Sequence, residues 1–388
     1  MDSRIFLLAL ATFATGTAEN IVIGILPDVA LGLGVSLGLA GQLTAVFSLT
    51  FALAAPAALL LARRMERKTI LAFALAMFIV ANLVAALSPG IAVLFAARMV
   101  MAAASAAVCL VATMMATELA GPDRRGRAIG LIFMGISGSM VLGVPAGMLI
   151  SSLFGWRGVF VALASLAVLI LIACQWLLPV SGRRPSDVAG YRRHVGSLRL
   201  VSGQLVSILM IGGHFVLFAY LAPYAVDAVG FDAGQLVPIF VAFGVAGVSG
   251  GYFGGWLTDI VTPRTAILVV PLAYLAVLLA IPAASSLPVA FVGLMMVWAC
   301  ISWMISPVVQ SFLISAGPET AEAGVSLNLS AMHVGVALGT AIGGLALDRG
   351  SAAALPWTGA ILAALAVAAS LIAAWRTGSK QGRPAIQV

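Results

Sequence analysis

A single carboxylate, Glu19, interrupts the otherwise apolar run GTAENIVIG near the start of the chain, and Arg98 is the second charge that falls deep within an apolar stretch. A charge inside a membrane costs about 2.5 to 3.5 kcal/mol on insertion scales, so each needs a partner or a function. Thr12, Thr15 and Glu19 share one face of a helix, which favours a cavity wall. We predict that Glu19 and Arg98 meet and couple proton movement to function. The alternative is a structural, hydrogen-bonded acid.

Polar and aromatic side chains recur in apolar stretches of the second half of the chain. Aromatic rings stack on a planar solute while amides read its edge, so these residue types suit a small planar polar ligand. The alternative for each residue is a hydrogen bond between helices. The residues that we expect to contact a substrate are Thr15, Asn20, His214, Tyr220, Trp303, Gln310, Asn328 and His333.

The elements that position these residues must be membrane helices. The chain of 388 residues is 62% hydrophobic and only 9% charged, whereas ordinary soluble domains are roughly 25% charged. Apolar runs of about 20 residues recur, and each can cross a hydrocarbon core of roughly 30 Å as a helix. Barrel strands would show shorter, alternating segments. We predict an all-α membrane protein with twelve transmembrane helices at residues 4–26, 38–61, 69–88, 91–117, 128–153, 158–178, 200–226, 234–257, 265–284, 287–315, 324–347 and 352–375.

Basic residues are concentrated in alternate loops, within residues 63–68, 124–127 and 183–193 and in the tail at 376–383. The opposite loops hold mainly aspartates. Because cytoplasmic loops carry the excess of Lys and Arg, we predict a multi-pass membrane protein with both termini in the cytoplasm. The net charge of +7 then reflects topology and anionic lipid. We expect no nucleic-acid partner, since the bases are scattered over separate short loops.

The longest polar interruption divides the predicted helices six and six. Segments on its two sides resemble each other, such as GTAENIVIGILPDVA with GQLTAVF, and GGHFVLFAYLAPYA with GQLVPIF. We predict an N-terminal six-helix bundle at residues 1–178, a cytoplasmic linker at 179–199, a C-terminal six-helix bundle at 200–375 and a tail at 376–388. Two pseudo-symmetric bundles of this kind hold their substrate between them, near the middle of the membrane.

Motifs of several other protein classes are absent from the sequence. The three cysteines fall inside predicted helices without C-x-x-C spacing, so we expect neither disulfides nor a metal site. The chain has no G-x-x-x-x-G-K-S/T nucleotide motif, no H-E-x-x-H and no G-x-S-x-G. We therefore expect no cofactor and no enzyme centre.

Several motifs occur in order at the corresponding predicted helices. PDRRGRAIG precedes the fifth helix, GVPAGMLISSLFGWR lies at its end, AARMVMAAASAA carries Arg98 in the fourth, and GGWLTDIVTPR ends the eighth. In these features the chain resembles the major facilitator superfamily, in particular its twelve-span drug/H+ antiporters of bacteria. Small residues four apart let helices pack closely, and a proline such as Pro145 bends its helix. Together with the resemblance, these features imply alternating access. The residues expected to act in gating are Gly143, Pro145, Gly147, Asp259 and Arg264.

One loop departs from the family pattern. Where the family has Asp-Arg-x-Gly-Arg, this chain reads RRMERK, with Arg63 in place of the acid and Glu66 in place of the glycine. In the family this loop helps to latch the inner gate. The latch must therefore use Glu66 or depend more on Asp259.

Longer stretches resemble the purine base and nucleoside efflux pumps and their arabinose-efflux relatives. They include NLVAALSPG, GHFVLFAYLAPY, SWMISPVVQSFLISAGPE and NLSAMHVGVALGTAIGG. The resemblance implies export of purine bases or nucleosides in exchange for protons, across the bacterial inner membrane. The rival functions are export of drugs such as phenicols or of sugars, and a membrane sensor without transport, for which linker and tail are too short. We expect a monomer whose partners are the substrate, protons and the lipid bilayer.

Overall fold

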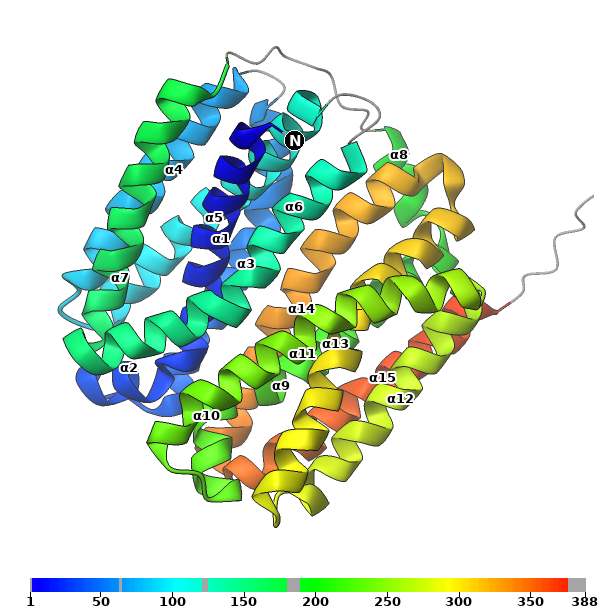
Figure 1. Ribbon diagram of the computed structural model, residues 1–388. Coiled ribbons are helices and arrows are strands. Elements are labelled where there is room, and N and C mark those ends of the chain that lie inside the picture. Colours follow the sequence, from blue (N-terminus) through cyan, green and yellow to red (C-terminus); the bar gives the residue numbers. More distant parts are fainter. Residues whose placement is uncertain (1, 63–64, 121–124, 180–188, 376–388) are drawn as a thin grey trace, which may run out of the picture.

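The computed structural model describes residues 2–62, 65–120, 125–179 and 189–375, and every regular element among them is a helix (Figure 1). The first half comprises α1 (Ser3–Gly24), α2 (Leu26–Leu33), α3 (Leu37–Ala62), α4 (Arg67–Ala86), α5 (Ile91–Ala120), α6 (Arg125–Gly138), the π-helical turn η2 (Ser139–Gly143) and α7 (Val144–Leu177). The second half comprises α8 (Ala189–Val195), α9 (Leu198–Phe218), α10 (Leu221–Tyr224), η3 (Ala225–Val229), η4 (Ala233–Gln235), α11 (Leu236–Ile260), α12 (Pro263–Ala284), α13 (Pro288–Ala316), η5 (Pro318–Thr320), α14 (Ala321–Arg349), η6 (Ala352–Ala354) and α15 (Leu355–Ala374).

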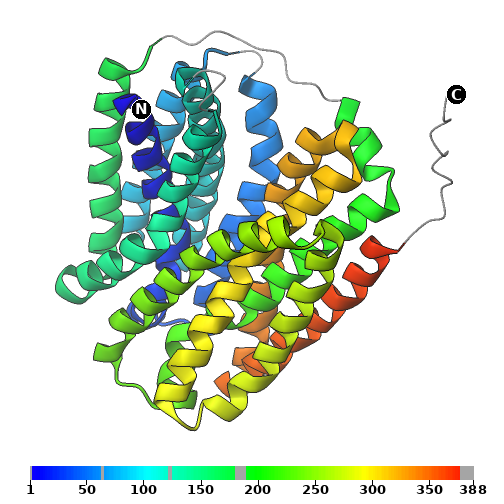
Figure 2. The same ribbon diagram turned by 45° about the vertical axis from the view of Figure 1, so that its right-hand side comes forward.

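Eleven stretches of the described residues are long and apolar enough to cross a membrane. One of them, Gly130–Leu177, is 48 residues long, more than twice the length of one crossing. Gly155 breaks it with φ 75° and ψ 164°, a conformation that glycine adopts readily and other residues rarely do. The helix is kinked at Gly155, and the ribbon of this part of the chain runs in two directions (Figure 2). The all-helical membrane architecture is confirmed, while the count of twelve crossings stays a prediction.

Large apolar side chains cover the outside of the helices. Leu53, Phe73, Leu169 and Trp176 are each more than half exposed, with Trp176 at 86%. Soluble proteins rarely expose apolar surface on this scale, because water makes it unfavourable. The exterior therefore fits contact with lipid.

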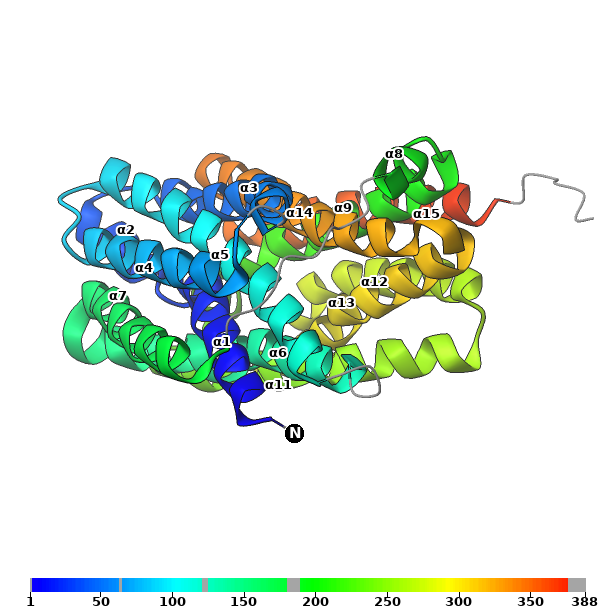
Figure 3. The same ribbon diagram turned by 90° about the horizontal axis from the view of Figure 1, so that it is seen from above.

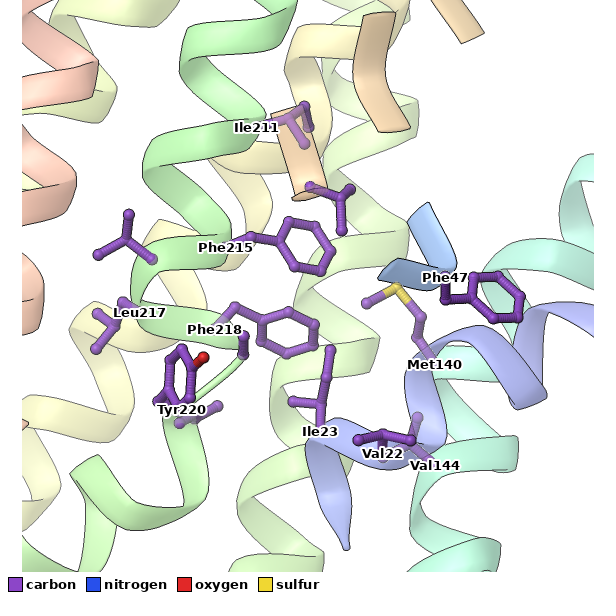
Figure 4. Packing of buried hydrophobic residues seen from close by; sticks show 14 of the residues in the cluster. Val22, Ile23, Phe47, Met140, Val144, Ile211, Phe215, Leu217, Phe218 and Tyr220 are labelled. Carbon is purple, nitrogen blue, oxygen red and sulfur yellow. The ribbon is translucent and has the colours of Figure 1, made fainter. Parts of the chain in front are cut away.

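The two halves lie side by side when the molecule is seen from above (Figure 3). α3 packs along α14, and α11 packs against η2 and α7. Between these helix pairs, Val22 and Ile23 of α1 lie opposite Phe218 of α9 in a buried apolar cluster (Figure 4). Apolar side chains thus fill much of the contact between the halves.

A π-helical turn interrupts the helix between α6 and α7. Pro145 follows it at the second position of α7, and a proline both lacks an N–H and crowds the preceding turn. Gly143 and Gly147 face α1, where an added Cβ would overlap the side chains of Thr17 and Ile21. The irregularity lies where the sequence predicts a bend, and the glycines allow α1 to pack closely beside it.

Polar contacts join the halves at the end of the molecule that carries α2 and α10, here called the outer end. Asp348, near the end of α14, accepts hydrogen bonds from Ser36 Oγ and from the N–H of Gly38, both at 3.1 Å. A carboxylate is a favourable partner for the unpaired N–H groups at the start of a helix, here α3. The opposite end carries α8 and the start of α1 and is called the inner end.

The predicted linker is partly helical. α8 lies within predicted residues 179–199, and α9 already begins at Leu198. Residues 180–188 of the linker and the predicted tail 376–388 lie outside the described residues, as do Arg63, Arg64 and Arg124, on which the predicted orientation partly rests.

Candidate functional site

Glu19 of α1 reaches across to His333 of α14. Its Oε1 is 3.3 Å from His333 Nε2, and the two side chains are 17% and 11% exposed. The His333 ring stacks on Phe51 of α3, with ring centroids 3.9 Å apart and planes within 3°. His333 Nδ1 lies 2.9 Å from the carbonyl oxygen of Leu329, one turn earlier. Glu19, Phe51 and His333, here called the central site, therefore connect the first half with the second.

Arg98 of α5 lies beside the central site. Its guanidinium donates to the backbone carbonyls of Ala18, of Glu19 at 3.1 Å and of Leu43 at 3.4 Å, and the side chain is fully buried. The predicted proximity of Arg98 and Glu19 is thus present, but the contact is to the Glu19 backbone, and the carboxylate turns to His333. The sequence could not show whether Arg98 contacts the backbone carbonyl or the side-chain carboxylate of Glu19, because both groups belong to the same residue.

The other predicted contacts on α1 are buried between helices. Thr15 Oγ1 lies 3.2 Å from the carbonyl oxygen of Ala11, to which it donates, and 3.7 Å from Cys109 Sγ on α5. Asn20 Nδ2 donates to the carbonyl of Gly16 at 3.1 Å. The predicted polar face of α1 therefore forms helix contacts at Thr15, rather than a cavity wall.

Asn328 lies in a hydrogen-bond network between α14 and α9. Its Nδ2 donates to Gln204 Oε1 at 2.9 Å and to Ser207 Oγ at 2.8 Å, and the side chain is fully buried. Gln204 Nε2 donates to the carbonyl of Gly324 at 2.9 Å and lies 3.0 Å from His194 Nε2. In this conformation the amide of Asn328 holds helices together, which is the alternative that the sequence left open.

His214 lies in an aromatic cluster. Its ring centroid is 5.0 Å from that of Phe218 and 4.9 Å from that of Trp298, and the residue is 1% exposed. Neither ring nitrogen has a hydrogen-bond partner among the described residues. The surroundings are apolar and closed, so in this conformation His214 offers no open polar surface to a solute.

Trp303 lines a small recess at the contact of the halves. Met140 of η2 lines it from the first half, and Phe243 of α11 from the second. The Trp303 Nε1–H is buried without a hydrogen-bond partner among the described residues. Gln310, two turns further along α13, donates to Ser306 Oγ at 3.0 Å and is half-buried.

Tyr220 lies at the outer end of the contact between the halves. It is fully buried, its hydroxyl donates to the carbonyl of Thr340 at 2.9 Å, and its ring lies against Gly41 of α3. A side chain at Gly41 would collide with the ring. Tyr220 thus packs the closed outer end instead of lining an open pocket.

The predicted gating residues Asp259 and Arg264 lie at the inner end, where α11 ends and α12 begins. Asp259 is exposed, and within the described part of the chain it forms no ion pair. Glu66 precedes α4 without a capping hydrogen bond from its side chain. The gating roles of these residues stay predictions.

Three residues of interest escaped the sequence analysis. Phe51 is one apolar residue among many, and only its stacking on His333 distinguishes it. His194 lies in the predicted linker, and nothing in its sequence surroundings signals burial at 1% exposure. Asp348 lies in the last turn of α14, and nothing in its sequence surroundings indicates that it binds the start of α3.

The chain was compared with known protein families and proteins. The family model of the Major Facilitator Superfamily matches residues 8–327. The MFS-type transporter YbcL of Bacillus subtilis is 31% identical over 371 residues, 95% of each chain. The chloramphenicol resistance protein of Streptomyces lividans is 31% identical over 379 residues, also 95% of each chain. A probable sugar efflux transporter of Mannheimia succiniciproducens is 25% identical over 368 residues, 94% of this chain and 92% of its own.

Solved structures of transporters share the fold. A bacterial homologue of the human lysosomal transporter Spinster, in an inward-facing and unoccupied conformation, matches with a TM-score of 0.79 and 18% identity over 96% of each chain. A D-xylose-proton symporter matches with a TM-score of 0.75 and 15% identity, over 95% of this chain and 96% of its own. At these identities the likeness concerns the fold alone.

Proposed function

Because the chain belongs to the Major Facilitator Superfamily, we propose that it exports a small organic solute in exchange for protons, with purine bases or nucleosides as the leading substrate class. It is a transporter and not an enzyme. We further propose twelve crossings in two six-helix bundles. The break at Gly155 separates two crossings of the first bundle, and the linker before α9 joins the bundles. We propose that the protein lies in the inner membrane with both termini in the cytoplasm.

The observation that carries the proposal is the contact of Glu19 with His333. Two groups that can bind protons come from opposite halves and meet within helices that are otherwise apolar. An ionisable residue inside the membrane is a functional-site hypothesis by default, and here its partner lies on the half that moves relative to it in alternating access. Binding or loss of a proton at the Glu19–His333 contact can therefore shift the equilibrium between conformations in which the two halves are closed or apart at this site.

The proton gradient is a sufficient energy source. One proton that enters down 100 mV supplies about 2.3 kcal/mol. At about 1.4 kcal/mol per tenfold, this sustains a roughly fiftyfold gradient of a neutral solute. A single exchanged proton is therefore enough for useful export.

The direction of proton movement tests the proposal. The protein is reconstituted into vesicles that contain a pH-sensitive dye, and a purine base, a nucleoside, a sugar or chloramphenicol is added outside. If solute enters in exchange for protons, the lumenal pH rises. A fall in lumenal pH would indicate symport, and no change with any solute would contradict proton-coupled transport of these classes.

Phenicol export is the second candidate. It is supported by the 31% identity to the chloramphenicol resistance protein over 95% of both chains. Aromatic groups at the contact of the halves, such as Phe51 and Trp303, suit a nitrophenyl ring as well as a purine. The vesicle experiment separates the two, because the lumenal pH responds only to the transported solute.

A further inference from the structure

The hydrogen bonds of His333 fix the number of protons at the central site. A backbone carbonyl oxygen only accepts hydrogen bonds, so the 2.9 Å contact with Leu329 requires a proton on His333 Nδ1. In a neutral ring the other nitrogen, Nε2, then presents a lone pair. That nitrogen lies 3.3 Å from Glu19 Oε1. Two lone pairs facing each other repel, so the contact requires one more proton, on Nε2 or on the carboxyl group.

The groups around Glu19 and His333 are compatible with the pair both when it holds that proton and when it has lost it. From α5, Arg98 lies on the backbone of Ala18 and Glu19, and Cys109 lies near Thr15. From α3, the uncharged ring of Phe51 stacks on His333, and the uncharged ring of Phe47 packs against the Arg98 guanidinium. With the proton, Glu19 and His333 together are neutral. Without it they carry one negative charge beside the Arg98 cation, which stabilises that charge.

We propose that Glu19 and His333 share one proton, and that the hydrogen bond made by this proton holds α14 against α1. The inference deepens the proposed function and depends on it. When the proton leaves, the lone pair of Nε2 meets an ionised carboxylate and the contact opens. The proton is therefore carried by the pair, and Arg98 positions the α1 backbone without binding the Glu19 carboxylate.

The ring of His333 also occupies a surface that a substrate can use. An imidazole lies flat on Phe51 at 3.9 Å and points an N–H or a ring nitrogen at a carboxyl group. Once the proton leaves and His333 moves away, both the Phe51 face and the Glu19 carboxylate become free. The ligand chemistry that fits them is a flat nitrogen heterocycle with an N–H donor at its edge. Proton and substrate then compete for Glu19, as exchange requires.

Nitrogen NMR of the histidine rings tests the shared proton. The chain has three histidines, so protein labelled with ¹⁵N-histidine in nanodiscs gives three pairs of ring nitrogen signals, and the His333→Asn variant assigns one pair. We expect the neutral His333 ring to carry its proton on Nδ1. We also expect Glu19→Gln to displace the His333 titration midpoint by about one pH unit or more, while His194 and His214 titrate as before. A His333 ring protonated on Nε2 alone, or an unchanged midpoint, would overturn the proposal.

Transport of two variants separates the roles of the pair and of the stacking surface. Asparagine at position 333 can still donate to Glu19 but cannot titrate, so His333→Asn should transport downhill yet lose most of the wild-type pH dependence. Phe51→Leu should keep that pH dependence and bind heterocyclic substrates at least tenfold more weakly. If His333→Asn keeps the pH dependence, Glu19 alone carries the proton and the inference fails while proton-coupled export stands. If wild-type transport has no pH dependence, the proposed function itself fails.

Discussion

Replacing Asn328 by alanine separates a structural from a substrate-binding role for this residue. Its amide donates two hydrogen bonds from α14 to α9 and is fully buried. Side-chain hydrogen bonds between membrane helices contribute about 0.6 kcal/mol each on average and about 1.7 kcal/mol at most. Removing the donor also leaves Gln204 Oε1 buried without it. We therefore expect Asn328→Ala to lower the free energy of unfolding by about 1 to 3 kcal/mol.

The measurement is equilibrium unfolding in a bilayer mimic, with substrate binding followed in the same preparation. Gln310→Ala is the matched control, because Gln310 is half-buried and its amide donates to Ser306 on its own helix. We expect the control to change the free energy of unfolding by less than about 0.5 kcal/mol. An Asn328→Ala protein that is as stable as wild type but binds substrate weakly would refute the structural role.

Three further predictions concern packing, the inner end and the outer end. Gly335→Ala places a Cβ 2.6 Å from a backbone oxygen of α9 and should lower the free energy of unfolding by about 1 to 3 kcal/mol. Gly251→Ala is the control, because a Cβ at that position meets no atom within 4 Å. Equal melting temperatures of the two variants would contradict the prediction. Burial lowers the pKa of His194 below its ordinary 6.5. Because the exposed ring then binds protons more readily than the buried one, docking of α8 is complete above pH 6.5 and weakens as the pH falls below it. Hydrogen exchange of α8, corrected for its intrinsic pH dependence, should rise at pH 5, and a pH-independent rate would be inconsistent with this. Asp348→Ala removes two hydrogen bonds to the start of α3, so the outer end should open more often. A cysteine introduced at buried Thr44 should then react severalfold faster with a polar maleimide. An unchanged labelling rate would show that Asp348 does not hold the outer end closed.

The sequence predicts the helices well because each depends on local properties. Hydropathy and length identify the membrane stretches, and the boundaries of α12, predicted at 265–284, agree with Pro263–Ala284 within two residues. Pro145 and the glycines around it predict the irregular turn at η2. The break at Gly155 falls in the gap between the helices predicted at 128–153 and 158–178, where helix continues on both sides of one unusual backbone conformation.

The side-chain partners in the central site depend on how helices from the two halves are rotated against each other. Glu19 and Arg98 were both recognised as costly charges, and their depths in α1 and α5 bring them together. Which atoms meet is decided by packing, and His333 competes for the carboxylate from the opposite half. His214 shows the same limit, because its spacing from Gln204 suggests a shared face, yet the ring enters an aromatic cluster while Gln204 joins a polar network.

The most direct test of the account is the response of Glu19→Gln to a pH gradient. Glutamine resembles the protonated acid, so the variant should insert normally and exchange labelled substrate across vesicle membranes at equal pH on both sides. When a pH gradient is imposed, wild type should accumulate substrate several times above equilibrium, and Glu19→Gln should show no accumulation. Accumulation by Glu19→Gln equal to that of wild type would contradict proton coupling through the central site and would leave Glu19 a structural hydrogen-bonding group.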